Sequence, residues 1–130
     1  MGNITGAADI KVTIDGNISV FSATEFLGYL SSSRINGLGK ESIYISYGHE
    51  VPSGDDQEFD LTESGATYRD AKGDDWSMPT SGKLKLTVVR SEFGDSFQHA
   101  ATLVDLTFGG QTPVVVLNGK YTIKYSALEK

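Results

Sequence analysis

Two short segments of the sequence place a pair of aspartates directly after a glycine. Asp55 and Asp56 follow Gly54, and Asp74 and Asp75 follow Gly73. Calcium is bound by six to eight hard oxygen atoms, which carboxylates in flexible loops can supply. The two loops could therefore provide four metal ligands at one end of the fold: Asp55, Asp56, Asp74 and Asp75. Neither loop has EF-hand spacing, and aspartates after glycine are also common in turns, so a solvated acidic loop is the interpretation that competes with a calcium site.

Two aromatic residues lie close to the second aspartate pair. Trp76, the only tryptophan of the chain, follows Asp75 directly, and Tyr68 precedes Trp76 by eight residues. Sugar-binding β-sandwiches stack an aromatic ring on the sugar while acidic side chains accept its hydroxyl protons. The candidate ligand-binding residues are therefore Tyr68, Asp74, Asp75 and Trp76, with a carbohydrate or a protein as the partner. In the competing interpretation, Trp76 only covers the core.

Patterns that would indicate catalysis are weak. The chain has no cysteine and two histidines, His49 and His99. Ser96, His99 and Asp105 cannot form a triad on one extended strand, because at ~3.3 Å per residue the imidazole and the carboxylate are about 20 Å apart. We therefore expect no catalytic residues, no enzyme and no cofactor. His99 is expected at a strand edge or half-buried with a hydrogen bond. A small hydrolase is the alternative, and it would need a pocket that holds one histidine against a carboxylate.

The net charge of −6 comes from a single stretch of the chain. Residues 55–75 contain eight acidic and two basic residues, whereas the remainder contains nine of each. Without a basic cluster, neither a nucleic acid nor an anionic membrane surface is an expected partner. The longest aliphatic run, Val114–Leu117, is far shorter than the ~20 residues that span a bilayer.

The elements that must position these residues are strands. Gly, Ser and Thr make up 40 of the 130 residues, and apolar residues recur at every second position in segments such as 43–47 and 84–88. We predict one soluble all-β domain over residues 1–130, an antiparallel β-sandwich of eight or nine strands. A small closed barrel that binds an apolar ligand is the alternative. Residues 48–80, with two of the three prolines, are expected to form a long irregular region that contains short strands at 58–61 and 66–68.

Two turns are predicted with their register. Asn118-Gly119 suits a type I′ turn, which would pair Val116 with Tyr121 in a hairpin. At the first hairpin, the burial pattern favours a three-residue loop over residues 15–17 that pairs Ile14 with Ile18.

Three other features of the chain are less regular. A capping-box pattern at residues 22–25 allows a short helix near residues 24–31, although a continuing strand fits these residues as well. The inward positions of the long strand 97–108 change parity, which predicts a β-bulge near residues 100–101. Residues 91–95 are expected to form a turn.

Taken together, these patterns favour a non-enzymatic binding or interaction module with its functional end at residues 48–80, since recognition usually resides in loops on a rigid scaffold. The polar start of the chain predicts no signal peptide within it. If a leader has been removed, the acidic, cysteine-free composition suits a bacterial-type secreted, periplasmic or cell-envelope protein.

Overall fold

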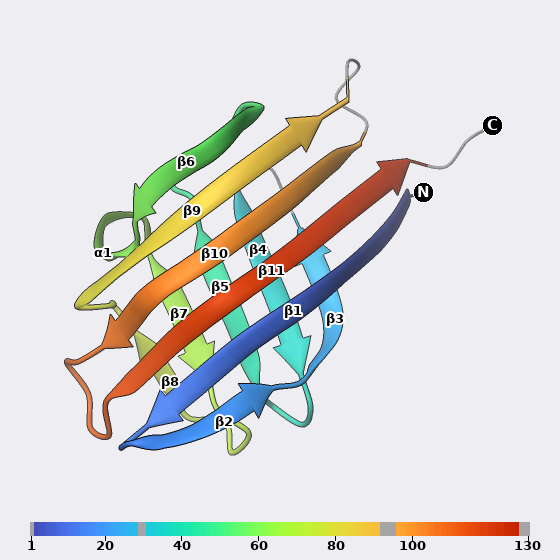
Figure 1. The fold of residues 1–130 in the computed structure, drawn as a ribbon. Coiled ribbons are helices and arrows are strands. Elements are labelled where there is room, and N and C mark those ends of the chain that lie inside the picture. Colours follow the sequence, from blue (N-terminus) through green and yellow to red (C-terminus); the bar gives the residue numbers. More distant parts are fainter. Residues whose placement is uncertain (1, 29–30, 92–95, 128–130) are drawn as a thin grey trace.

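The computed structural model describes residues 2–28, 31–91 and 96–127, which form two antiparallel β-sheets (Figure 1). In spatial order, the six-stranded sheet consists of β2 (Asn17–Phe21), β1 (Gly2–Ile14), β11 (Val115–Ala127), β10 (Phe97–Phe108), β9 (Ser81–Arg90) and β6 (Gly54–Asp60). The five-stranded sheet consists of β3 (Ala23–Gly28), β4 (Ser32–Gly37), β5 (Ser42–Ser46), β7 (Ala66–Arg69) and β8 (Asp75–Ser77).

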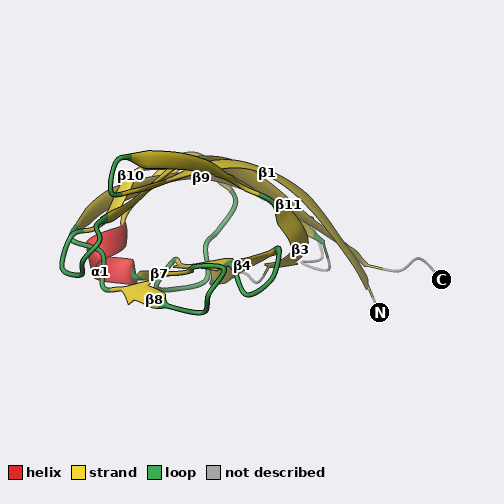
Figure 2. Ribbon diagram, turned by 90° about the horizontal axis from the view of Figure 1, so that it is seen from below, coloured by secondary structure: helices red, strands yellow, loops and turns green. Residues whose placement is uncertain are grey.

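The two sheets lie face to face, with the longer six-stranded sheet arched over the shorter one (Figure 2). Each sheet keeps two edge strands, β2 and β6 in one and β3 and β8 in the other. The predicted all-β sandwich is therefore confirmed, and its two sheets contain eleven strands in the described residues where eight or nine were expected. The closed barrel is wrong, and with it the apolar-ligand barrel that was the alternative. No helix in the described parts of the chain has the length and hydropathy needed to cross a membrane.

The core forms between the sheets because inward side chains alternate with outward ones along each strand. In β5 and just after it, Ile43, Ile45 and Tyr47 are buried, as are Leu84, Leu86 and Val88 of β9. The period-two segments of the sequence thus predicted their inward faces correctly.

The turn between β1 and β2 contains only two residues, Asp15 and Gly16. Their φ angles of 52° and 83° are the positive values that a type I′ turn requires. Ile14 consequently pairs with Asn17, and the predicted three-residue loop is wrong. That prediction assumed a buried Ile18, but Ile18 is 69% exposed. The conformational preference of the Asp-Gly pair therefore determines the register of this hairpin.

Strand β11 continues without interruption through Asn118 and Gly119, so the hairpin predicted there is wrong. Gly119 has a φ of 142°, and a Cβ atom on it would come within 2.1 Å of the carbonyl oxygen of Asp9 on β1. The Asn118 side chain accepts a hydrogen bond from the backbone N–H of Asp105 on β10, at 2.8 Å. The Asn-Gly pair thus forms no turn. Gly119 lets β1 come close to β11, and Asn118 bonds β11 to β10.

Strand β10 changes the side that it presents to the core at a β-bulge. Leu103 is buried before the bulge, and Leu106 and Phe108 are buried after it. The register with β11 shifts between Leu103 and Leu106, where Asp105 has a φ of 48°. The expected parity change is present, but its predicted position near residues 100–101 is wrong. Ala101 and Leu103 keep the same parity, so the strand stays regular beyond that point.

The one helix among the described residues, α1, spans Leu61–Ser64. Asp60 caps it, because its Oδ1 accepts hydrogen bonds from the backbone N–H and the hydroxyl of Thr62 at 3.0 and 2.6 Å. The helix considered for residues 24–31 is wrong over residues 24–28, which continue the chain as β3. Residues 29 and 30 lie outside the described part of the chain.

Residues 48–80 are not a long irregular region. They form β6, α1, β7 and β8, and the chain crosses from one sheet to the other within them. The short strands expected at 58–61 and 66–68 correspond to β6 and β7. Most of the turn expected at residues 91–95 lies outside the described residues.

Candidate functional site

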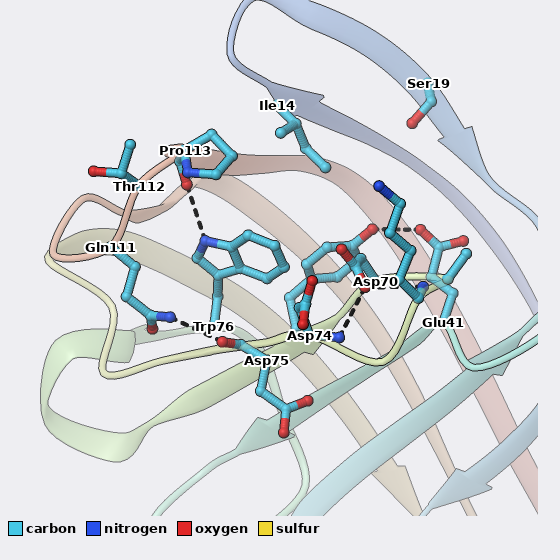
Figure 3. Close-up of a pocket in the computed structure, with 13 residues that line it drawn as sticks. Ile14, Ser19, Glu41, Asp70, Asp74, Asp75, Trp76, Gln111, Thr112 and Pro113 are labelled. Atoms are coloured by element: carbon cyan, nitrogen blue, oxygen red, sulfur yellow. Dashed lines mark hydrogen bonds between the residues drawn. The ribbon is translucent and has the colours of Figure 1, made fainter.

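A pocket of about 690 Å³ opens at the end of the sandwich where four connections meet. These are the β1–β2 turn, the β4–β5 loop, the β7–β8 loop and the β10–β11 loop (Figures 1 and 3). The pocket therefore takes residues from both sheets. Its walls are formed by Ile14, Ser19, Glu41, Tyr68, Asp70, Ala71, Lys72, Asp74, Asp75, Trp76, Gln111, Thr112 and Pro113.

Two aromatic residues form the inner wall of this pocket. Tyr68 is 1% exposed and Trp76 is 5% exposed, and their ring centroids are 5.9 Å apart. The Trp76 Nε1–H donates to the carbonyl oxygen of Pro113 at 2.9 Å, and the Tyr68 hydroxyl donates to Glu41 Oε2 at 2.5 Å. Burial and the adjacent Glu41 carboxylate raise the pKa of Tyr68 well above its ordinary value, so the phenol keeps its proton. Both rings are rigid parts of the wall.

The β7–β8 loop shapes the acidic side of the pocket. Asp70 Oδ1 accepts hydrogen bonds from the backbone N–H groups of Lys72 and Asp74, at 3.0 and 2.9 Å. Backbone hydrogen bonds join Asp70 to Gly73 and to Asp74. Within the described residues, neither the Asp74 carboxylate nor the Lys72 ammonium group has a hydrogen-bond or ion-pair partner. The loop is therefore ordered, while two charged groups stay open to a ligand.

Asp75 lies on the rim and faces the outer surface of the five-stranded sheet. Its carboxylate accepts two hydrogen bonds from the Arg69 guanidinium, at 2.7 and 3.2 Å, and points away from the Trp76 ring (Figure 3). Hydrogen bonding to Arg69 lowers the pKa of Asp75. Asp75 is consequently a fixed anion that is already paired, in contrast to Asp74.

The structure brings together the four residues that the sequence predicted as ligand-binding. Tyr68, Asp74, Asp75 and Trp76 all line the same pocket. The Trp76 ring is almost entirely covered, so it has little free face on which a ligand could stack as expected. The competing interpretation, in which Trp76 covers the core, describes its burial better.

The structure does not bring together the four carboxylates that the sequence offered to calcium. Asp55 and Asp56 lie at the start of β6 in one sheet, whereas Asp74 and Asp75 lie beside β7 and β8 in the other, at the opposite end of the sandwich (Figure 1). Among the described residues, no three His, Cys, Asp or Glu side chains are grouped in a way that could hold a metal ion. The shared placement at one end is wrong because β6 and β7 carry the chain along the sandwich between the two aspartate pairs, and the chain changes sheets between these strands.

Sequence reasoning missed the other nine residues of the pocket lining, among them four that contribute charged or hydrogen-bonding groups: Glu41, Lys72, Gln111 and Pro113. Gln111 Oε1 accepts from the backbone N–H of Ser77 at 3.2 Å, and its Nε2 donates to the carbonyl oxygen of Asp75 at 2.9 Å. Glu41 and Gln111 lie 70 residues apart in the chain, and no local pattern joins them. Of these four, only Lys72 could have been found, since it lies between Tyr68 and Asp74.

Both histidines lie away from the pocket walls. His99 is fully buried, which corrects the expectation of an edge or half-buried residue, and its Nδ1 lies 3.1 Å from the hydroxyl of Tyr47. His49 is exposed and its ring lies 5.9 Å from that of Phe59.

Comparisons of the chain with protein families, with curated proteins and with solved structures found no match. What the pocket can bind is therefore inferred from the residues that line it.

Proposed function

We propose that the protein is a non-enzymatic binding module whose ligand pocket takes a carbohydrate. One observation carries this proposal: Tyr68, Asp74, Asp75 and Trp76, predicted together from the sequence, line a single pocket of about 690 Å³. Sites for small molecules typically measure ~300–1,000 Å³ and combine a few polar groups with aromatic walls. The pocket has that size and that composition.

The polar groups of the pocket suit a partner with many hydroxyl groups. A sugar hydroxyl can donate to the Asp74 carboxylate and accept from the Lys72 ammonium group, which both lack partners among the described residues. Hydrogen bonds to charged groups contribute about 1.5–3 kcal/mol each, more than those between neutral groups. Glu41 uses Oε2 to accept from Tyr68, which leaves its other carboxylate oxygen for the ligand.

Much of the pocket is held in place before any ligand arrives. Trp76 is hydrogen-bonded to Pro113, and Gln111 is hydrogen-bonded to the backbone at the two ends of β8. Asp70 accepts hydrogen bonds from the backbone of its own loop. A preformed site avoids part of the ordering entropy that binding otherwise costs.

Neither His49 nor His99 lines this pocket, which favours binding over hydrolysis as its role. The protein partner that the sequence also allows stays a prediction.

The fluorescence of Trp76 tests the proposal directly, because it is the only tryptophan and lies in the pocket wall. Titration with a panel of neutral mono- and oligosaccharides is expected to change its emission in a saturable way. The Asp74→Asn variant is expected to bind roughly tenfold more weakly, since it loses a charged acceptor. Asp55→Asn, the same substitution at the opposite end of the sandwich, is the matched control and should bind as the unaltered protein does.

Two results would contradict the proposal. One is the absence of any saturable change, in fluorescence and in calorimetry, with every member of the panel. The other is an equal effect of Asp74→Asn and Asp55→Asn, which would show that the charge matters only through the overall potential of the protein.

A further inference from the structure

The outer face of the five-stranded sheet carries side chains in straight rows across the strands. Since Ile43 and Ile45 face the core, Tyr44 between them faces outward. Cross-strand pairing places Arg34 of β4 on one side of Tyr44 and Thr67 of β7 on the other. Directly opposed side chains have Cβ atoms about 4.5–5.5 Å apart. Tyr44 is therefore the centre of this face.

Two further depressions lie beside Tyr44, with volumes of about 320 and 540 Å³. Both are lined by Tyr44 and Thr67, and the smaller one is also lined by Asp75. Asp75 is at the same time a rim residue of the ligand pocket. The pocket thus meets the smaller depression at Asp75, and the two depressions lie on either side of the Tyr44–Thr67 pair along β5 and β7. We call the two depressions on the sheet face the Tyr44 groove.

Tyr44 has what the aromatic residues of the ligand pocket lack, a ring that a ligand can reach. It is 41% exposed, against 1% for Tyr68 and 5% for Trp76. Only an open ring face can stack on a sugar, so the stacking expected of Trp76 is available at Tyr44. The period-two pattern of residues 43–47 predicts that Tyr44 faces outward, but no pattern in the sequence places its ring beside the Asp75 rim of the pocket.

The remaining lining of the Tyr44 groove mixes polar residues with the apolar Ala66, Met78 and Pro79, and Arg34 gives it one positive charge that has no ion-pair partner among the described residues. Arg69 and Asp75 neutralise each other in an ion pair, and the guanidinium of Arg34 bonds to the uncharged Asn36. Hydroxyl-bearing side chains supply most of the other polar groups: Ser42, Ser46, Thr62, Ser64, Thr67 and Ser77. This lining matches a neutral ligand that is rich in hydroxyl groups.

A peptide is a poorer match to the same surface. Peptides bind to sheets mainly by adding a strand to an open edge or by placing apolar side chains in apolar pockets. Strands β5 and β7 lie inside the sheet, each paired on both sides. Strand β8 is an edge, but the Gln111 amide already pairs with the backbone of Asp75 and Ser77 there. Apart from Tyr44, the apolar lining consists of Ala66, Met78 and Pro79, and Met78 is 84% exposed, so the groove offers little enclosed space for apolar side chains.

We propose that the carbohydrate is an oligosaccharide, and that it extends from the ligand pocket past Asp75 into the Tyr44 groove, where one of its sugar rings stacks on Tyr44. This inference rests on the function proposed above. It assigns recognition of chain length to the outer face of the five-stranded sheet and recognition of the terminal sugar to the pocket.

The test compares short and long members of one sugar series, such as glucose, maltotriose and maltohexaose, and the corresponding cello-oligosaccharides. The affinity of the unaltered protein is expected to rise with chain length in the series that it binds. Tyr44→Ala is expected to remove this gain, on the order of fivefold to tenfold, and to leave the affinity for the shortest bound sugar unchanged. Tyr44→Phe keeps the ring and should retain the gain.

Thr67→Arg provides a second variant, because a long side chain at this position fills the groove next to Tyr44. Thr67→Arg should reduce the affinity for long chains only. Thermal melting verifies that all three variants, Tyr44→Ala, Tyr44→Phe and Thr67→Arg, are folded. Equal affinity for short and long sugars, or a loss at Tyr44→Ala that is the same for all lengths, would overturn the extension and leave the pocket proposal intact. Absence of binding at every length would overturn the proposed function itself, and this inference with it.

Discussion

The His99 imidazole is enclosed in the core among hydroxyl groups. Its Nδ1 lies 3.1 Å from the hydroxyl of Tyr47, which in turn lies 3.1 Å from the hydroxyl of Tyr121 and is hydrogen-bonded to Ser33. Nε2 is buried without a partner among the described residues. Burial lowers the pKa of His99 to about 4 and raises that of Tyr47 to about 12, so all three titratable groups of this cluster are neutral near pH 7.

The stability of the fold should therefore fall in mild acid. In the unfolded chain His99 takes up a proton near its ordinary pKa of 6.5, whereas in the folded protein it does so only near 4. Between these values the unfolded state binds more protons, so stability rises with pH across this window. The neutral His99 contributes its full share to the free energy of unfolding above about pH 6.5, and this share is lost as the pH falls towards 4. Its full size is roughly 3 kcal/mol, measurable by urea denaturation at a series of pH values.

His99→Phe removes the titrating group and should flatten the pH dependence by that amount. The variant also takes one partner from the Tyr47 hydroxyl, so it should be about 1 kcal/mol less stable at pH 7. His49→Phe, the same substitution at the exposed histidine, is the control and should keep the dependence of the unaltered protein. Parallel pH profiles for the unaltered protein and His99→Phe would show that the buried imidazole is not the cause.

At the scale of the strands, Gly119 shows why β11 can run through an Asn-Gly pair. Its φ of 142° disfavours any other residue, and a Cβ atom would meet the Asp9 carbonyl oxygen at 2.1 Å and the Cα of Ile10 at 2.7 Å. Gly119→Ala adds backbone strain to a steric clash, each of which costs about 1–3 kcal/mol. We expect a loss of roughly 3 kcal/mol or more in the free energy of unfolding.

Gly16→Ala is the matched control for this substitution. Gly16 also has a positive φ, 83°, but no atom lies within 4 Å of the position that its Cβ would take. Only the backbone strain remains there, about 1–2 kcal/mol. If Gly119 were in an exposed turn, as the sequence alone suggests, the two variants would be destabilised equally. Denaturation of both under one condition separates these cases.

The two hairpin predictions failed for opposite reasons. At Asp15-Gly16 the turn preference determines the register against the apolar pattern of β2, which is an edge strand with little to bury. At Asn118-Gly119 the chain stays extended despite the turn preference of this pair. Leu117 before it and Tyr121 after it are four residues apart, so in a continuous strand both face the core, and both are buried. Parity across the Asn-Gly pair was the signal in the sequence that favoured a continuous strand. Alternation predicted the inward faces well, but it says nothing about which strand is an edge.

At the scale of the whole molecule, the sequence could predict only the part of the site that is local in the chain. Tyr68, Asp74, Asp75 and Trp76 lie within nine residues on one hairpin, so they share a pocket almost regardless of the rest of the fold. Pairing Asp55 with Asp74 required knowledge of where the chain changes sheets. The same is true of Glu41 and Gln111, which reach the pocket from the β4–β5 and β10–β11 loops.

The β10–β11 loop joins the two sheets at the pocket, and Gln111 carries much of this connection. β8 is an edge strand of three residues, and the Gln111 amide binds the backbone at both of its ends in the way that a neighbouring strand would. It thereby protects an edge that could otherwise pair with another chain.

Gln111→Ala should therefore loosen β8 without unfolding the sandwich. Each lost hydrogen bond contributes about 0.5–1.5 kcal/mol, so we expect a loss of roughly 1–2 kcal/mol in overall stability. The amide hydrogen of Ser77 should exchange with solvent faster, because its acceptor is gone, and the ligand pocket should bind more weakly as its wall becomes mobile. Gln98→Ala, at an exposed glutamine of β10, is the control and should change neither. Unchanged exchange at Ser77 in Gln111→Ala would mean that β8 is held by its pairing with β7 alone, and that the two sheets are not joined through this loop.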